Sequence, residues 1–164
     1  MKNTSCKWVA LIYTVALFLV YTCHGTLPLA SDTPWWHHLT YHHFHASVFH
    51  LLCNLWAFLT IVFYMNPSIT RVIGAFLLAS TFPASWLGDS SVIGLSGTIY
   101  VLCGMYSLSS PTLRGRVRYN TFMLVFITAG LVFPSVCVSI HLYCYALGLV
   151  IAVLNYPFFK TTRQ

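Results

Sequence analysis

Long apolar stretches separated by a few charged residues constrain this chain more than any other feature of its sequence. Only 6% of the 164 residues are charged and 58% are hydrophobic, whereas about a quarter of the residues of a soluble domain carry a charge. The intervals between the charges are long enough for helices to cross the hydrocarbon core of a bilayer. The sequence therefore predicts an all-α, multi-pass membrane protein that forms a single domain over residues 1–164.

Six spans fit between the charges, and alternation of six spans across a bilayer places both termini on one side. In this arrangement all eight Lys and Arg lie on the side of the termini, and Asp32 and Asp89 lie on the other. Because cytoplasmic loops are enriched in Lys and Arg, both termini are predicted to be cytoplasmic. This topology accounts for the net charge of +6 without a nucleic-acid partner. The spans are expected at about residues 8–23, 46–64, 69–87, 96–110, 119–134 and 140–158, with an outer loop at about 24–45.

The first span follows Lys2 and Lys7, an arrangement that also occurs in cleaved signal peptides. Tyr21 fits poorly into the small-residue cleavage site that such a peptide would need before Cys23. We therefore expect the first span to be retained as a membrane helix.

The outer loop contains a cluster of histidines beside Trp35 and Trp36. Trp and Tyr favour the headgroup region, so the loop is expected to lie at the outer interface. Neutral imidazole is a common ligand of zinc and copper, but no carboxylate or thiol accompanies the cluster. We expect it to face water without binding a metal. Its members are His37, His38, His42, His43 and His45.

Four polar side chains are predicted to lie within the spans or at their outer ends. His50 and Asn54 are four residues apart and so share one face of the second span. Ser96 opens the fourth span within the motif G-L-S-G, and His141 lies near the outer end of the sixth. Polar side chains at membrane depth usually face the bundle interior. We therefore expect the four groups to converge in the outer leaflet.

Ser96 and His141 supply the two groups that nucleophilic catalysis by serine requires. Serine is a poor nucleophile without an adjacent base, and histidine is the usual base. Asp32 and Asp89 are the only acids in the chain and both lie in outer segments, so no carboxylate is expected to orient the histidine. The sequence therefore predicts a Ser–His dyad.

Acyl transfer also needs hydrogen-bond donors aimed at the oxyanion of its intermediate. His50, Asn54 and the backbone N–H of Ser96 at a helix N-terminus are candidates for these donors. Together with the dyad they would complete a hydrolytic site.

These motifs, in this order, resemble those of the rhomboid family of intramembrane serine proteases. The match covers about residues 35–156 and consists of H-x-x-x-N, G-x-S-G and a histidine in the last core helix. The resemblance implies six helices, Ser96 as nucleophile, His141 as general base, and His50 with Asn54 as oxyanion donors. It also implies a water-filled cavity open to the outer side, a transmembrane-helix substrate and no cofactor.

Supporting glycines and one tyrosine extend the resemblance. Tyr100 and Gly104 follow the serine as in the family's fourth helix, and Gly148 follows the histidine by seven residues. The two glycines of G-x-S-G are Gly94 and Gly97.

Three positions depart from the family pattern. Cys144 replaces the usual glycine three residues after the histidine, and Ile140 replaces the preceding alanine. The Trp-Arg pair of the first outer loop is Trp35 and Trp36 here. The resemblance therefore does not by itself predict that the fourth and sixth helices pack closely.

We expect a serine-type endopeptidase of the bacterial inner (plasma) membrane, with its active site open to the outer side and peptide bonds of membrane-spanning proteins as substrate. One alternative is an inactive rhomboid-like protein that binds membrane partners, although such proteins generally lose the serine or the histidine. The other is a histidine-rich metal-binding membrane protein.

Overall fold

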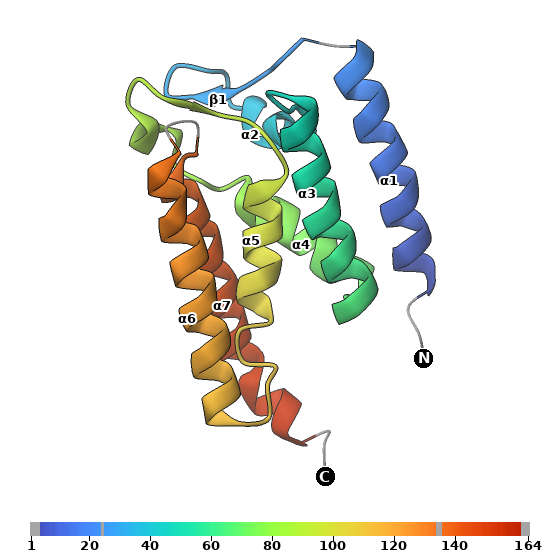
Figure 1. Ribbon diagram of the computed structural model, residues 1–164, viewed down its shortest axis with the longest axis vertical. Coiled ribbons are helices and arrows are strands. Elements are labelled where there is room, and N and C mark those ends of the chain that lie inside the picture. The colour runs from blue at the N-terminus through green and yellow to red at the C-terminus, as the bar shows by residue number, and fades with distance from the viewer. Residues whose placement is uncertain (1–3, 24, 134–135, 162–164) are drawn as a thin grey trace. The chain divides into compact units, whose positions relative to one another are not determined.

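The computed structural model describes residues 4–23, 25–133 and 136–161. Over these residues the chain is mostly helical (Figure 1). The longer helices are α1 (Thr4–Cys23), α3 (Val48–Thr60), α4 (Ile69–Ala79), α5 (Ser96–Met105), α6 (Leu113–Ala129) and α7 (Val138–Thr161). The short elements are β1 (Leu29–Ala30), α2 (His37–Thr40), η1 (Tyr41–His43), η2 (Ile61–Met65), η3 (Ala84–Leu87), β2 (Ser91–Val92) and η4 (Gly130–Val132).

Three helices in the described part of the chain are long and apolar enough to cross a membrane. They are Thr4–Cys23, Val48–Met65 and Val138–Tyr156. α4 and α5 are also apolar, but their 11 and 10 residues reach only about 16 and 15 Å at about 1.5 Å per residue. The helical structure and the three long helices fit an all-α membrane protein.

The chain forms two compact units, residues 1–99 and 100–164, whose boundary falls within α5. In the first unit α1 packs beside α3 (Figure 1). Leu51, Leu55 and Phe58 are the buried apolar residues of α3, and their spacing of three or four places them on one helix face.

A short antiparallel pairing ties the outer loop to the segment that precedes α5. Leu29 in β1 lies opposite Val92 in β2, and Leu29 is fully buried. Two residues beyond β2, the N–H of Gly94 donates to the carbonyl of Tyr41 at 2.9 Å. The segment leading into α5 is therefore held by two parts of the outer loop.

α4 covers only the first part of the span expected at about residues 69–87. α4 ends at Ala79. Pro83 has no N–H to continue a helix and disfavours a helical conformation in the residue before it. The hydroxyls of Ser80 and Thr81 donate to backbone carbonyls three or four residues earlier. The chain then continues through a turn into η3.

α5 ends earlier than expected, at Met105 rather than near residue 110, and α6 begins earlier, at Leu113 rather than near residue 119. Thr112 caps α6, since its side chain accepts from the N–H of Gly115 at 3.1 Å. The basic cluster therefore lies in the first two turns of α6 and not in a loop. Its members are Arg114, Arg116 and Arg118. Pro134, at the expected end of this span, lies outside the described residues.

In the second unit, α6 and α7 lie side by side (Figure 1). α6 supplies donors to the C-terminal end of α5: the Tyr119 hydroxyl donates to the Cys103 carbonyl at 2.9 Å, and the Asn120 amide to the Ser107 carbonyl at 3.0 Å. The Tyr145 hydroxyl of α7 donates to Asn120 Oδ1 at 2.7 Å. These bonds hold the C-terminal end of α5 and the residues that follow it against α6 and α7.

Two glycines allow the backbones of α5 and α7 to approach closely. A Cβ on Gly104 would lie 2.8 Å from the Gly148 Cα, and a Cβ on Gly148 would lie 2.9 Å from the Gly104 Cα. Real Cβ atoms essentially never come this close, so small residues are required here, as is common between membrane helices. Ile140 and Cys144, which depart from the family pattern, are both buried in α7 and are compatible with this contact.

Candidate active site

The motif before Ser96 is shaped by contact between Gly94 and His50. Gly94 has φ +112°, a conformation that residues with a side chain rarely adopt. A Cβ at this position would lie 2.8 Å from Cε1 and 2.9 Å from Nε2 of His50. The imidazole of His50 therefore packs on the chain two residues before Ser96.

A second histidine contacts the same segment. His45 is 3% exposed, and its Nε2 accepts from the N–H of Leu95 at 3.4 Å. Its ring lies edge-to-face with that of His50, with centroids 5.1 Å apart. Burial, and to a lesser extent the nearby His50, lowers the pKa of His45 to about 4. The ring is therefore neutral near pH 7, with its proton on Nδ1 when Nε2 accepts.

Asn54 lies one turn after His50 on the same face of α3 and is 6% exposed. Its Nδ2 donates to the backbone carbonyl of His50 at 2.9 Å. The backbone N–H of His50 donates to the capping side chain of Ser47 at 3.1 Å. The first turn of α3 is thus fixed at both sides of His50.

Ser96 is the first residue of α5 and is half-buried, whereas Gly97 is buried. A helix N-terminus presents backbone N–H groups and the positive end of the helix dipole. An anion that forms beside Ser96 would therefore be stabilised.

In the second unit, His141 lies in the first turn of α7 against Tyr100 of α5. The two ring centroids are 4.4 Å apart and the ring planes are inclined by 34°. Tyr100 is 8% and His141 9% exposed. Gly148 lies two turns further along α7, at the contact with Gly104.

The predicted site residues are divided between the two units. In the first unit His50 contacts Gly94, and in the second unit Tyr100 contacts His141. The first unit holds His50, Asn54, Gly94, Ser96 and Gly97, and the second holds Tyr100, His141 and Gly148.

The expectation that the outer histidines face water is wrong. His37, His42 and His45 are buried, and His38 and His43 are half-buried. Each ring has a hydrogen-bond partner within the first unit, which offsets the loss of water. The pairs are His37 with the Pro28 carbonyl, His38 with the Ser80 carbonyl, His42 with the Ser80 and Thr98 hydroxyls, His43 with the Tyr13 hydroxyl, and His45 with the Leu95 N–H.

Across residues 4–23, 25–133 and 136–161, no three His, Cys, Asp or Glu side chains are grouped so that they could hold a metal ion. In each outer histidine, at least one ring nitrogen instead contacts a backbone or hydroxyl group of the protein.

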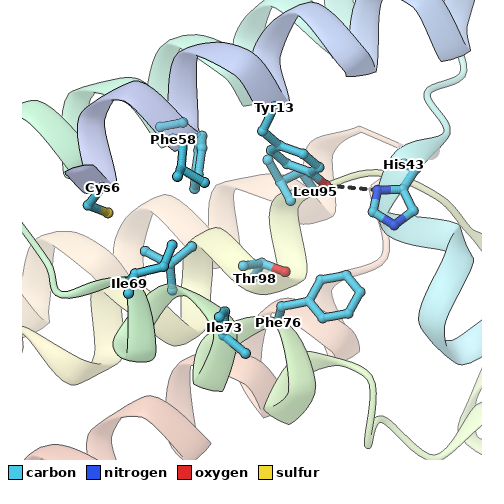
Figure 2. Close-up of a pocket in the computed structure, with 12 residues that line it drawn as sticks. Cys6, Tyr13, His43, Phe58, Ile69, Ile73, Phe76, Leu95 and Thr98 are labelled. Atoms are coloured by element: carbon cyan, nitrogen blue, oxygen red, sulfur yellow. Dashed lines mark hydrogen bonds between the residues drawn. The ribbon is translucent and has the colours of Figure 1, made fainter.

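The first unit also contains an apolar cavity of about 270 Å³. Figure 2 shows the Tyr13 hydroxyl hydrogen-bonded to Nδ1 of His43 at its edge, at 2.8 Å. Its walls are largely aliphatic and aromatic side chains of α1, α3 and α4, joined by Leu95 and Thr98. It is therefore not the water-filled cavity that the rhomboid resemblance implies.

His42 was expected only as one member of the outer histidine cluster, and Thr98 was not expected to have a role at the site. Their pairing joins residues 56 positions apart, and the pairing of His42 with Ser80 joins residues 38 apart. No local pattern distinguishes His42 from the neighbouring histidines.

No protein-family model matches this chain, and no curated protein has a significant sequence match to it. A function for the chain must therefore be argued from its own residues.

Proposed function

We propose that this chain is a rhomboid-like intramembrane serine endopeptidase that hydrolyses peptide bonds in membrane-spanning proteins. The observation that carries the proposal is the packing of the His50 ring on Gly94, immediately before a serine that opens a helix. This arrangement brings a polar ring of α3 beside the helix N-terminus that carries the candidate nucleophile, as acyl transfer requires.

In this proposal Ser96 Oγ attacks the substrate carbonyl carbon while His141 takes the hydroxyl proton. The imidazolium then gives its proton to the leaving amine, and water hydrolyses the acyl-enzyme with His141 again as base. Support for the pairing comes from Tyr100, which follows Ser96 by one turn on the same face of α5. The ring of Tyr100 lies against His141.

The oxyanion would be stabilised by His50, Asn54 and the N–H groups at the start of α5. His50 is supported by its own contacts, since its backbone N–H is held by Ser47 and its carbonyl by Asn54. Donors fixed before the reaction stabilise the developing charge without having to reorganise.

We further propose six spans, with both termini cytoplasmic and the site open to the outer side of a bacterial inner membrane. α4, α5 and α6 occupy the regions of the expected third, fourth and fifth spans. α4 and α5 are shorter than the roughly 30 Å hydrocarbon core, so their ends would need protein or water around them. Lys2 and Arg163, which contribute to the charge asymmetry, lie outside the described residues.

The proposal is tested by labelling membranes with a fluorophosphonate probe and locating the adduct by peptide mass spectrometry. Ser96 should carry the adduct, and Ser96→Ala should abolish it. Ser91→Ala is the matched control, because Ser91 is exposed in β2 only five residues earlier. An adduct that persists in folded Ser96→Ala would disprove the assignment of the nucleophile.

A further inference from the structure

His42 is the most completely enclosed histidine of the outer loop. It is 0% exposed, and its ring lies between those of Tyr41 and Phe76, with centroid distances of 3.8 and 4.6 Å. A buried polar ring is retained without a large energetic penalty only when its nitrogens are paired.

Both ring nitrogens of His42 have partners, and the partners define its tautomer. The Ser80 hydroxyl donates to the Phe76 carbonyl at 2.9 Å, so its oxygen accepts from Nε2–H of His42 at 3.0 Å. A neutral imidazole carries one N–H. Nδ1 of His42 therefore accepts from the Thr98 hydroxyl at 3.3 Å.

Burial first, and then the neighbouring His43, lowers the pKa of His42 to about 3. The ring therefore stays neutral near pH 7, as these hydrogen bonds require.

Thr98 lies in the first turn of α5, two residues after Ser96. Successive helical residues are separated by about 100°, so these two side chains point in directions about 200° apart. When Thr98 is held toward η1, Ser96 is directed to nearly the opposite side of α5. Ser96 then shares a face with Tyr100.

The same loop holds the chain on the other side of Ser96. The carbonyl of Tyr41, adjacent to His42, accepts from the N–H of Gly94 at 2.9 Å. Two consecutive residues of η1 therefore fix the chain two positions before and two positions after Ser96.

We propose that His42 is a positioning residue that sets the direction of the Ser96 hydroxyl by holding Thr98 and so fixing the rotation of the first turn of α5. Ser80 completes the link by joining the opposite side of the His42 ring to the end of α4. This role rests on the proposed function of Ser96 as nucleophile.

The test compares the second-order rate of Ser96 labelling by a fluorophosphonate in wild type and in Thr98→Val. Valine keeps the shape of threonine but removes the hydroxyl that His42 accepts from. Small misplacements of a reacting group lower rates by up to about 100-fold, so we expect labelling to slow by about 10- to 100-fold. In assays of a transmembrane substrate the loss should appear in kcat with KM nearly unchanged.

Two variants separate positioning from general destabilisation. Thr98→Ser restores a hydroxyl and should return the rate to within about threefold of wild type, which corresponds to less than about 0.7 kcal/mol. Thr14→Val is the matched control, because the Thr14 hydroxyl donates to the Ala10 carbonyl of its own helix, α1. It should leave the labelling rate unchanged. Thermal unfolding in detergent confirms that each variant is folded, and Thr98→Ala replaces Thr98→Val if the valine variant does not fold.

A double-mutant cycle with Ser80→Ala tests whether the effect passes through His42. If it does, the double variant should lose less than the product of the two single losses. If Ser96 is labelled in wild type and folded Thr98→Val is labelled at the same rate, the positioning role of His42 alone is overturned. Absence of any Ser96 labelling in wild type would overturn the proposed function itself, so the two failures are distinguishable.

Discussion

The imidazole of His50 lies against Gly94 so closely that a methyl group on this glycine would be 2.8 Å from the ring. The contact joins the start of α3 to the segment that opens α5. It exists because Gly94 has no side chain and adopts a positive φ.

Gly94→Ala should therefore destabilise the protein and slow Ser96 labelling. A non-glycine residue in a sparsely populated conformation costs about 1–3 kcal/mol, and displacement of the His50 ring adds to this. Gly74→Ala is the matched control, since nothing lies within 4 Å of a Cβ at that position. The measurement is thermal unfolding in detergent for both variants. Equal stability of Gly94→Ala and wild type would show that the His50 contact is not made.

Gly148→Ala should weaken the second unit. The added Cβ would lie 2.9 Å from both the Gly104 Cα and the Met105 nitrogen, and overpacking of a close helix contact costs about 1–3 kcal/mol. The free energy of unfolding in mild detergent, compared with that of the same Gly74→Ala control, measures the effect. A neutral Gly148→Ala would contradict the close approach of α5 and α7.

Stability should fall when the pH is lowered below the ordinary pKa of histidine. Burial lowers the pKa of His42 to about 3 and that of His45 to about 4, whereas unfolded histidine titrates near about 6.5. Between these values the unfolded chain binds more protons, so acid favours unfolding. The contribution is complete above about pH 6.5 and is lost progressively toward about pH 4.

Unfolding midpoints measured in detergent from pH 8 to pH 4 would test this dependence. Thr98→Val, which leaves His42 in place, should retain a fall in stability on acidification, whereas His42→Gln should show a smaller fall. A midpoint that rises as the pH is lowered would contradict the burial of neutral histidines.

The oxyanion donors and the aspartates should respond differently to mutation. Loss of one oxyanion donor in Asn54→Ala should slow cleavage by about 10²–10³-fold, because other donors remain. Asp32→Asn and Asp89→Asn should leave the rate nearly unchanged, since a dyad has no carboxylate to lose. Cleavage of a helical substrate in liposomes measures all three. A loss confined to Asp89→Asn would indicate a Ser–His–Asp triad.

The sequence predicted helices in all six apolar regions, because apolar length between charges is a local property. It did not predict that α4 ends at Ala79, although Pro83, which cannot continue a helix, follows four residues later. Gly94 and His50 were each singled out from motifs. Their contact depends on a positive φ that sequence does not encode.

The burial of the outer histidines was even harder to predict from residue composition. A cluster of polar rings next to tryptophans suggested a surface facing water. Most of the rings are instead paired with groups 30 or more residues away in the chain, as His42 is with Thr98. Burial of this kind depends on tertiary partners and leaves no periodic pattern.

The central claim is that Ser96 and His141 form the dyad of an intramembrane protease. Its most direct test is cleavage of a transmembrane-helix substrate by purified protein in liposomes, comparing wild type with Ser96→Ala and His141→Ala whose folding is verified by thermal unfolding. We predict cleavage by wild type and only background cleavage by either variant, because we expect no second candidate for either role at that membrane depth. Undiminished cleavage by folded Ser96→Ala or folded His141→Ala would contradict this account.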